Sequence, residues 1–286
     1  MRFATNKTIS HASRFALVLV VATGRTDAHA LTRSTTPSAT VTSTATLAFD
    51  HSHKQWSDVL AAHVSGDRVA YAKLKAGRTK LDQYVKSMQA VTADEYKGWK
   101  RDERCAFWIN AYNAFTVQRV VDAYPIESMK DLGNLVTSVW DQKSVALGKL
   151  RPDVGGDKLS LNEIQNKILR DTFKDARVHA ALCSAATSSP EIVQEAFTAA
   201  RLDAQLDARA QAWLAGAARN KFDRAASKVQ VSKVFDWYKE DFVRDAGSVQ
   251  GWLAKHAPES ERAWIASAKP LKIDFLEYAW KLNDAK

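Results

Sequence analysis

Apolar positions recur at helical spacing along most of this chain. In residues 54–64 they fall on one helical face: Trp56, Val59, Leu60 and Val64. Residues 103–124 are apolar around most of the circumference, begin with acidic residues and stop before Pro125. An acidic first turn and a closing proline are helix boundary signals, and an all-round apolar helix lies inside a domain. The pattern therefore predicts a buried central helix over 103–124.

Two further segments also predict helices. Residues 160–170 begin with Ser160, followed three residues later by Glu163, which is the spacing of a capping box. Residues 190–217 are alanine-rich and amphipathic. We expect them to form one interrupted helix or two helices joined by a short turn.

Shorter apolar segments between the helical patterns predict strands. These are residues 145–150 before the Gly155-Gly156 turn, residues 177–183, and the alternating residues 229–235. Helical patterns outnumber them. The sequence therefore predicts a helix-rich α+β fold with a small antiparallel sheet.

The N-terminal composition predicts the domain organisation. Residues 1–30 place basic residues before the apolar run 15–23, and Ala28-His29-Ala30 offers small residues for cleavage. This is typical of a signal peptide and predicts an exported protein, periplasmic or extracellular, with an organelle transit peptide as the alternative. Residues 31–46 are rich in Ser and Thr and predict a linker. We expect a single globular domain over 47–286 and no transmembrane segment in the mature chain.

Composition excludes several classes of function. The net charge is +9, but part of the excess lies in the first thirty residues and the rest is scattered. No basic run interleaved with aromatic residues is present, so we expect no nucleic-acid partner. No Walker loop, GxGxxG, GxSxG, HExxH or CxxC motif occurs, and we therefore expect no cofactor and no metal. His51 and His53 are interpreted as solvent-facing residues that precede a helix.

The segment RVHAALCSAATSSPEI (177–192) raises the question of catalysis. Ser188 or Ser189 can cap a helix that begins at Pro190, since proline favours the first helical position. A strand leading through a short loop to a helix N-terminus places free N–H groups beside Ser184. The same arrangement is also a common structural connection.

A local catalytic pair is unfavourable in this segment. On a strand His179 and Cys183 share a face but stand about 13 Å apart, whereas a nucleophile and its base must lie within about 3 Å. Any partner of Cys183 or Ser184 must come from elsewhere, unless the segment is helical.

Four other residues are candidates for structural or binding roles. Cys105 and Cys183 could form one disulfide in an oxidising compartment, with a contribution of about 2–4 kcal/mol. Asn110 and Asn113 share a face of the predicted central helix. Buried amides need partners, so they either pin a neighbouring loop, which we favour, or line a pocket. WYKEDF and EYAWKLND are interpreted as aromatic packing with solvated acids.

Together these segments resemble the family known as domain of unknown function 547. The resemblance rests on six segments in family order: FDHSHKQW (49–56), AFWINAYNAFTV (106–117), KLSLNEIQNKILR (158–170), RVHAALCSAATSSP (177–190), VSKVFDWYKEDF (231–242) and FLEYAWKLND (275–284). It implies no settled activity that transfers to this chain.

Departures from the family's usual form bear on catalysis. Ser184 and Ser189 stand where members commonly carry cysteine, Gln165 and Asn166 replace Glu-His, and Ala279 replaces an acid. If the family acts as thiol hydrolases, the resemblance implies that the thiol, the imidazole and the acid are missing here. Serine has no comparable thiolate and depends on a general base. The interpretation therefore moves away from thiol catalysis.

The leading hypothesis is an exported domain with a pocket near Ser184 that binds a small molecule or peptide. Its catalytic site is weak or degenerate, with Ser184 and His179 as the candidate pair. The candidate binding residues are Asn110, Asn113, Ser188, Ser189 and Trp280. One alternative is an active hydrolase, with Ser184 as nucleophile and His179 as base, or with Cys183 as nucleophile through a one-residue shift. The other is a non-catalytic structural or partner-binding module.

Overall fold

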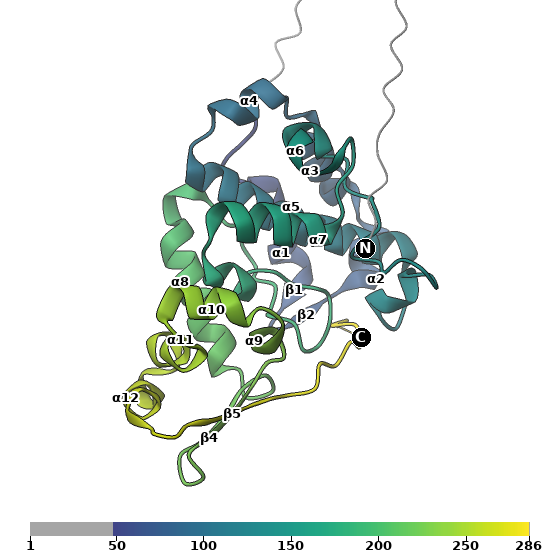
Figure 1. The fold of residues 1–286 in the computed structure, drawn as a ribbon. Coiled ribbons are helices and arrows are strands. Elements are labelled where there is room, and N and C mark those ends of the chain that lie inside the picture. The colour runs from purple at the N-terminus through teal and green to yellow at the C-terminus, as the bar shows by residue number, and fades with distance from the viewer. Residues whose placement is uncertain (1–47, 286) are drawn as a thin grey trace, which may run out of the picture. The chain divides into compact units, whose positions relative to one another are not determined.

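The computed structural model describes residues 48–285 (Figure 1). The signal peptide predicted at 1–30 and the linker predicted at 31–46 lie outside the described residues. The boundary of a single globular domain at residue 47 stays a prediction.

Helix α5 (Arg101–Ala123) runs through the middle of the molecule and is buried along most of its length. Glu103 accepts a hydrogen bond from the backbone N–H of Lys100 at 2.6 Å, and so satisfies a donor outside the helix ladder. The helix ends just before Tyr124 and Pro125, because proline has no N–H to continue it. The predicted buried central helix is confirmed.

Shorter helices pack against α5 and form the first hydrophobic cluster. Trp56 stacks on Tyr84 with ring centroids 5.7 Å apart, and the indole N–H of Trp108 donates to the Tyr96 hydroxyl at 2.8 Å. The helix predicted at 54–64 is confirmed. Helices that precede α5 in the described residues are α1 (Lys54–His63), α2 (Tyr71–Ala76), α3 (Thr79–Ala90) and α4 (Ala93–Gly98).

Short helical turns and one longer π-helix connect α5 to the second half of the fold. The predicted capping box is confirmed: Ser160 accepts from the N–H of Glu163, and Glu163 accepts from the N–H of Ser160. These elements are η1 (Met129–Leu132), η2 (Gly148–Leu150), α6 (Pro152–Gly155), α7 (Leu161–Glu163), the π-helix η3 (Ile164–Phe173), η4 (Ala176–Ala180) and η5 (Ala199–Arg201).

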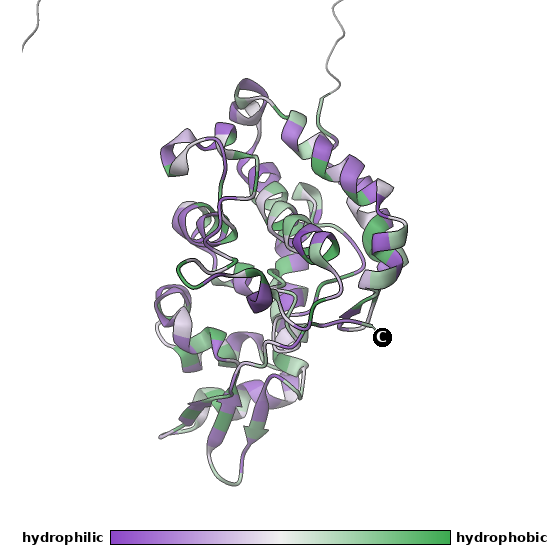
Figure 2. Cartoon of the chain, turned by 90° about the vertical axis from the view of Figure 1, so that its right-hand side faces the viewer, coloured by the Kyte–Doolittle hydropathy of each residue, from purple (hydrophilic) through white to green (hydrophobic). Residues whose placement is uncertain are grey.

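A second hydrophobic cluster is rich in aromatic residues. Trp213 stacks on Phe235 with ring centroids 4.7 Å apart, and Trp252 packs edge-on against Phe242. Figure 2 shows hydrophobic and hydrophilic residues mixed along the outer helices, as expected where each buries one face. The helices of this part are α8 (Leu202–Ala215), α9 (Val234–Trp237), α10 (Lys239–Ala246), α11 (Val249–His256) and α12 (Glu259–Ser267).

Strands in residues 48–285 form two small sheets, and the predicted helix-rich α+β fold is confirmed. β1 (Val64–Ser65) pairs antiparallel with β2 (Arg68–Val69). β4 (Lys228–Val231) pairs antiparallel with β3 (Lys221–Asp223) and parallel with β5 (Lys272–Phe275). This larger sheet is therefore mixed, and in it the prediction of an antiparallel sheet is correct only for the pairing of β3 with β4. The strand predicted at 229–235 is correct for its first half, and the helix α9 begins at Val234. The residues predicted as a strand at 145–150 form one bridge at Val145 and then the turn η2.

The strand predicted at 177–183 is wrong, because this segment begins with the turn η4. Asp175 caps the turn by accepting from the N–H of Arg177 at 2.9 Å, and Asp245 accepts from the N–H of Ala176. These carboxylates satisfy the backbone donors that a strand would have used.

The helix predicted to begin at Pro190 is also wrong, since α8 starts only at Leu202. Distant side chains hold the backbone of the segment 190–198 instead. Asn110 bonds both backbone polar groups of Phe197, and Ser57 accepts from the N–H of Ala196. The strand–loop–helix geometry expected beside Ser184 is therefore not formed.

In the part of the chain that the structure describes, no helix has both the length and the apolar character needed to cross a bilayer.

His53 is buried, whereas the sequence predicted a solvent-facing residue. It sits at the N-cap of α1 and its Nδ1 lies 2.7 Å from the Tyr84 hydroxyl. Burial lowers the pKa of His53 from 6.5 to about 3, and the charge of His51 adds to this effect. The folded chain therefore holds His53 neutral at pH values where the unfolded chain protonates it.

We predict that acidification destabilises the fold in part through His53. Below pH 6.5 the unfolded chain binds one more proton at His53 than the folded chain does. The free energy of unfolding therefore decreases as the pH is lowered, until about pH 3. Between pH 7 and pH 5 this contributes about 2 kcal/mol. Urea unfolding at both pH values should show a smaller loss in His53→Gln than in the wild type, and an equal loss in both would contradict the assignment.

Candidate functional site

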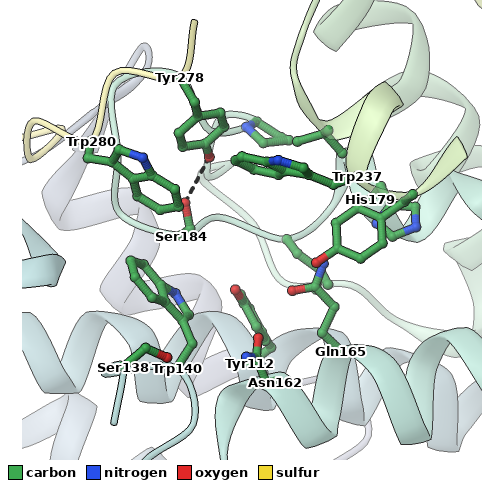
Figure 3. A pocket seen from close by; sticks show the side chains of 14 residues that line it. Tyr112, Ser138, Trp140, Asn162, Gln165, His179, Ser184, Trp237, Tyr278 and Trp280 are labelled. Atoms are coloured by element: carbon green, nitrogen blue, oxygen red, sulfur yellow. Dashed lines mark hydrogen bonds between the residues drawn. The ribbon is translucent and has the colours of Figure 1, made fainter. Parts of the chain in front are cut away.

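A cavity of about 230 Å³ lies where the first and second hydrophobic clusters meet. Figure 3 shows Trp237, Tyr278 and Trp280 on one side of it, and Tyr112, Asn162 and Gln165 on the other. We call it the aromatic pocket. Its lining residues are Tyr112, Ser138, Trp140, Asn162, Gln165, His179, Leu182, Ser184, Pro190, Val234, Trp237, Tyr238, Tyr278 and Trp280.

An extended segment, residues 276–285, supplies two of the aromatic rings. Tyr278 and Trp280 are two positions apart, so on extended backbone they point to the same side, toward the pocket. Ser188 holds the residue between them: its N–H donates to the carbonyl of Ala279, and its hydroxyl accepts from the N–H of Ala279 at 2.9 Å. Leu282 continues the pairing through a bridge to Ala186.

The aromatic rings contact one another and form a continuous wall. Tyr278 and Trp280 have ring centroids 4.5 Å apart, Trp237 and Tyr278 5.0 Å, and Trp140 and Trp280 4.9 Å. Trp237 comes from α9 and is 45% exposed, so the wall reaches the protein surface.

The opposite side of the pocket carries uncharged polar groups. Asn162 and Gln165 come from α7 and η3, which the Ser160 capping box starts, and Tyr112 comes from the middle of α5. Asn162 donates to Asp141 at 2.6 Å. Within residues 48–285 the Gln165 amide and the Tyr112 hydroxyl have no hydrogen-bond partner, so both are free to bind a ligand.

Ser184 reaches the pocket because α5 fixes the backbone before it. The amide of Asn113 donates to the carbonyl of Ala181 and accepts from the N–H of Cys183, both at 2.9 Å. Ala185 follows with a positive φ of 60°, a conformation that non-glycine residues adopt rarely. The hydroxyl of Ser184 lies 2.9 Å from the hydroxyl of Tyr278.

His179 borders the pocket but is engaged with Asp241. Its Nε2 lies 2.7 Å from Asp241 Oδ2, and its ring stacks on Tyr238 with centroids 4.3 Å apart. Burial opposes ionisation of Asp241, but hydrogen bonds from His179 and Arg170 outweigh it and hold the pKa of the carboxyl far below its usual range. Since Asp241 is ionised, Nε2 of His179 carries the hydrogen and donates the hydrogen bond to this carboxylate.

The remaining nitrogen of His179 has no role in a catalytic pair with Ser184. Burial lowers the pKa of His179, so the imidazole stays neutral. Its Nδ1 is buried without a hydrogen-bond partner, whereas Ser184 bonds Tyr278. The structure therefore brings His179 and Ser184 to one pocket without a hydrogen bond between them.

Both cysteines are buried and free, so the disulfide considered between Cys105 and Cys183 is not formed. The hydroxyl of Ser189 donates to the Pro190 carbonyl and lies 3.3 Å from the sulfur of Cys183. Burial raises the pKa of both thiols, that of Cys105 to about 12. Cys183 therefore points into the core as a neutral thiol and does not line the pocket.

Three of the residues predicted for the site line the pocket: Ser184, His179 and Trp280. The others form its support. Asn110 and Asn113 pin backbone, as the sequence favoured, Ser188 holds the segment 276–285, and Ser189 packs beside Cys183. Within residues 48–285 no three His, Cys, Asp or Glu side chains gather into a metal-binding cluster.

For several pocket residues the sequence predicts only a packing role. Trp237 and Tyr238 lie in WYKEDF, and Tyr278 lies in EYAWKLND. The sequence predicts a solvated Asp241, but this residue is buried and hydrogen-bonded to His179. The available signal was the spacing of Tyr278 and Trp280, two aromatic residues that share one side of an extended chain.

We predict that Asn113→Asp destabilises the fold by about 1–3 kcal/mol, because an oxygen replaces the N–H donor that faces the Ala181 carbonyl. Asn134→Asp is the matched control. Both hydrogen bonds of Asn134, to the N–H groups of Val136 and Thr137, use its side-chain oxygen, which aspartate retains. Urea unfolding of both variants tests this, and equal stability would contradict the role of Asn113.

Comparison with known proteins identifies a family for the part of the chain that supplies the earlier lining residues of the pocket. Residues 96–214 match the family model described as protein of unknown function, DUF547. That range contains Tyr112, Gln165 and Ser184, whereas the rings of Trp237, Tyr278 and Trp280 lie beyond it. Neither curated proteins nor solved structures give a match to the chain. The family resemblance of residues 49–56, 231–242 and 275–284 stays a prediction, and residues 96–214 constitute a DUF547 domain.

Proposed function

We propose that this protein binds a small uncharged ligand in the aromatic pocket and does not hydrolyse it. The observation that carries the proposal is the lining itself. Aromatic rings and neutral amide and hydroxyl groups surround the cavity, and among the described residues no Lys, Arg, Asp or Glu lines it. Pockets of mostly apolar surface with a few placed polar groups are typical ligand sites.

The surroundings of Ser184 support binding rather than nucleophilic attack. A serine needs a base within hydrogen-bond reach to lose its proton. The group at that position is the phenol of Tyr278, and burial raises the pKa of this phenol. A neutral phenol cannot remove the proton from Ser184. The pair therefore offers a hydroxyl donor and acceptor to a ligand.

The other candidate nucleophile is also unfavourable. Cys183 is buried, its thiol has a raised pKa, and it contacts Ser189 and Asn283 rather than the pocket. Thiol catalysis requires an exposed and readily ionised sulfur. A one-residue shift that exposes Cys183 would break its backbone hydrogen bond to Asn113.

One observation favours hydrolysis as a second candidate function. Asp241 orients the imidazole of His179 at the edge of the pocket, as the acid of a catalytic triad orients its histidine. The active alternative requires His179 to turn its free Nδ1 toward Ser184, away from its stacking on Tyr238.

We also propose export from the cytoplasm, on the basis of the apolar run at 15–23 and the small residues at 28–30. A ligand would then reach the pocket outside the cytoplasm.

A fluorophosphonate probe distinguishes the two candidate functions. We expect the intact mass of the folded protein to stay unchanged after treatment, because Ser184 has no base. Ser184→Ala, treated in parallel, should give the same result. A single adduct on the wild type that disappears in this variant would establish an activated Ser184 and overturn the proposal.

Two matched charge series test the binding of uncharged ligands. They are N-acetylglucosamine, glucosamine and glucuronate, and benzamide, benzylammonium and benzoate. We expect the neutral member of at least one series to bind tightest, measured by thermal shift and tryptophan fluorescence. Trp237→Ala should weaken its binding at least tenfold, because this ring is part of the wall.

The control is Trp264→Ala, which removes a part-exposed ring on α12 away from the pocket. Tightest binding by a charged member, or equal effects of the two substitutions, would contradict the proposed site.

A further inference from the structure

We propose that the ligand of the aromatic pocket is an uncharged sugar, held as a single pyranose-type ring. This inference rests on the proposed function and specifies its ligand class. Four features of the pocket support a sugar: the shape of the aromatic wall, the free polar groups opposite it, the placement of charge, and the size of the cavity.

The wall suits a puckered ring better than a flat one. Tyr278 is tilted by 46° against Trp237 and by 50° against Trp280, and Trp140 is tilted by 56° against Trp280. Trp237 and Trp280 lie closer to parallel, at 25°, but their ring centroids are only 5.9 Å apart. A planar ligand between two faces needs about 7 Å, twice the contact distance of carbon atoms, so this pair leaves no slot for one. A tilted set of rings makes a curved apolar surface. The C–H groups on the face of a pyranose ring pack against such a surface.

The polar groups match the rim of a sugar. A hydroxyl group both donates and accepts hydrogen bonds, so several hydroxyls need both kinds of partner. Gln165 offers both from its amide, and Tyr112 offers both from its hydroxyl. The hydrogen-bonded hydroxyls of Ser184 and Tyr278 together add one further donor and acceptor. In Figure 3 Gln165 and Tyr112 face the wall of Trp237 and Trp280 across the pocket.

Further donors are free within the wall itself. Among residues 48–285 the indole N–H groups of Trp140, Trp237 and Trp280 have no hydrogen-bond partner. Asn162 uses its amide nitrogen on Asp141 and keeps its oxygen free. Aromatic faces and hydrogen-bonding groups therefore occur side by side, as an amphipathic ligand requires.

The placement of charge disfavours ionic ligands. Lys130 lies over the ring of Trp280 with Nζ 4.7 Å from its centroid, and Arg170 lies over Tyr238 at the same distance. Arg170 is paired with Asp241, but Lys130 has no carboxylate partner among residues 48–285, so a cationic ligand would meet like charge behind Trp280. An anionic ligand would find no charged donor among the lining residues that the structure describes, so it would lose its hydration without compensation.

The size of the cavity is consistent with one ring. Its volume of about 230 Å³ lies below the range of about 300–1,000 Å³ that drug-sized ligands occupy. The exposed edge of Trp237 leaves the pocket open on one side.

Fluorescence titration with four uncharged compounds tests the sugar assignment. The sugars are methyl glucopyranoside and N-acetylglucosamine, and the planar compounds are benzamide and uracil. We expect saturable binding of at least one sugar, tighter than that of either planar compound. Gln165→Leu should weaken sugar binding at least tenfold. Leucine is similar in size to glutamine but can neither donate nor accept a hydrogen bond.

The matched control is Gln83→Leu, an exposed glutamine on α3 outside the pocket, which should bind like the wild type. Circular dichroism establishes that each variant is folded, and Trp237→Ala provides a second variant if Gln165→Leu is not.

The outcomes separate the two proposals. Binding of a planar compound without sugar binding would overturn the sugar assignment and leave the uncharged pocket in place. No binding by any of the four compounds to folded protein would overturn both. Sugar binding that Gln165→Leu and Trp237→Ala leave unchanged would place the site elsewhere and overturn the assignment to this pocket.

Discussion

The pocket depends on two buried amides that α5 presents to the backbone of distant segments. Asn113 bonds Ala181 and Cys183, and Asn110 bonds both backbone groups of Phe197. Inside a protein such hydrogen bonds are strong, and an unpaired partner is costly. The two amides therefore stabilise irregular backbone that would otherwise leave polar groups unsatisfied in the core. Because Asn113 fixes Cys183, the next residue, Ser184, reaches the pocket while the thiol stays inside.

Charge is kept behind the pocket rather than in it. Asp241 accepts hydrogen bonds from His179, Arg170 and Arg244, and so gathers one carboxylate and two guanidinium groups in a single, partly buried network. That network orients Tyr238 and His179 but leaves the surface they present uncharged. A binding site for a neutral molecule can thus stand beside strong ionic interactions without using them, since opposite charges a few ångströms apart largely cancel.

Local sequence signals predicted what local interactions determine. The buried helix α5, the helix α1 and the Ser160–Glu163 capping box follow from spacing and end signals alone. The predictions for 177–183 and 190–198 are wrong because distant groups determine the conformation of these segments. Asp245, Asn110 and Ser57 satisfy backbone polar groups there. The resemblance identified the DUF547 domain, and the pocket's support from Asn113 was partly foreseen. The placement of Tyr112 and Tyr278 on opposite sides of one pocket has no local signal, since each lies in a different part of the sequence.

The extended segment 276–285 has a consequence for the order in which the molecule folds. Its hydroxyl contact from Tyr278 to Ser184 joins residues 94 positions apart, and its contact from Asn283 to Tyr71 joins residues 212 apart. Helices such as α5 close short loops and form early, whereas such distant pairings carry a larger loop-closure entropy and form late. We therefore expect the aromatic wall to be among the last features to assemble. A ligand that bridges this wall and the helices opposite would act mainly on the rate of unfolding, by holding closed the contacts that were made last.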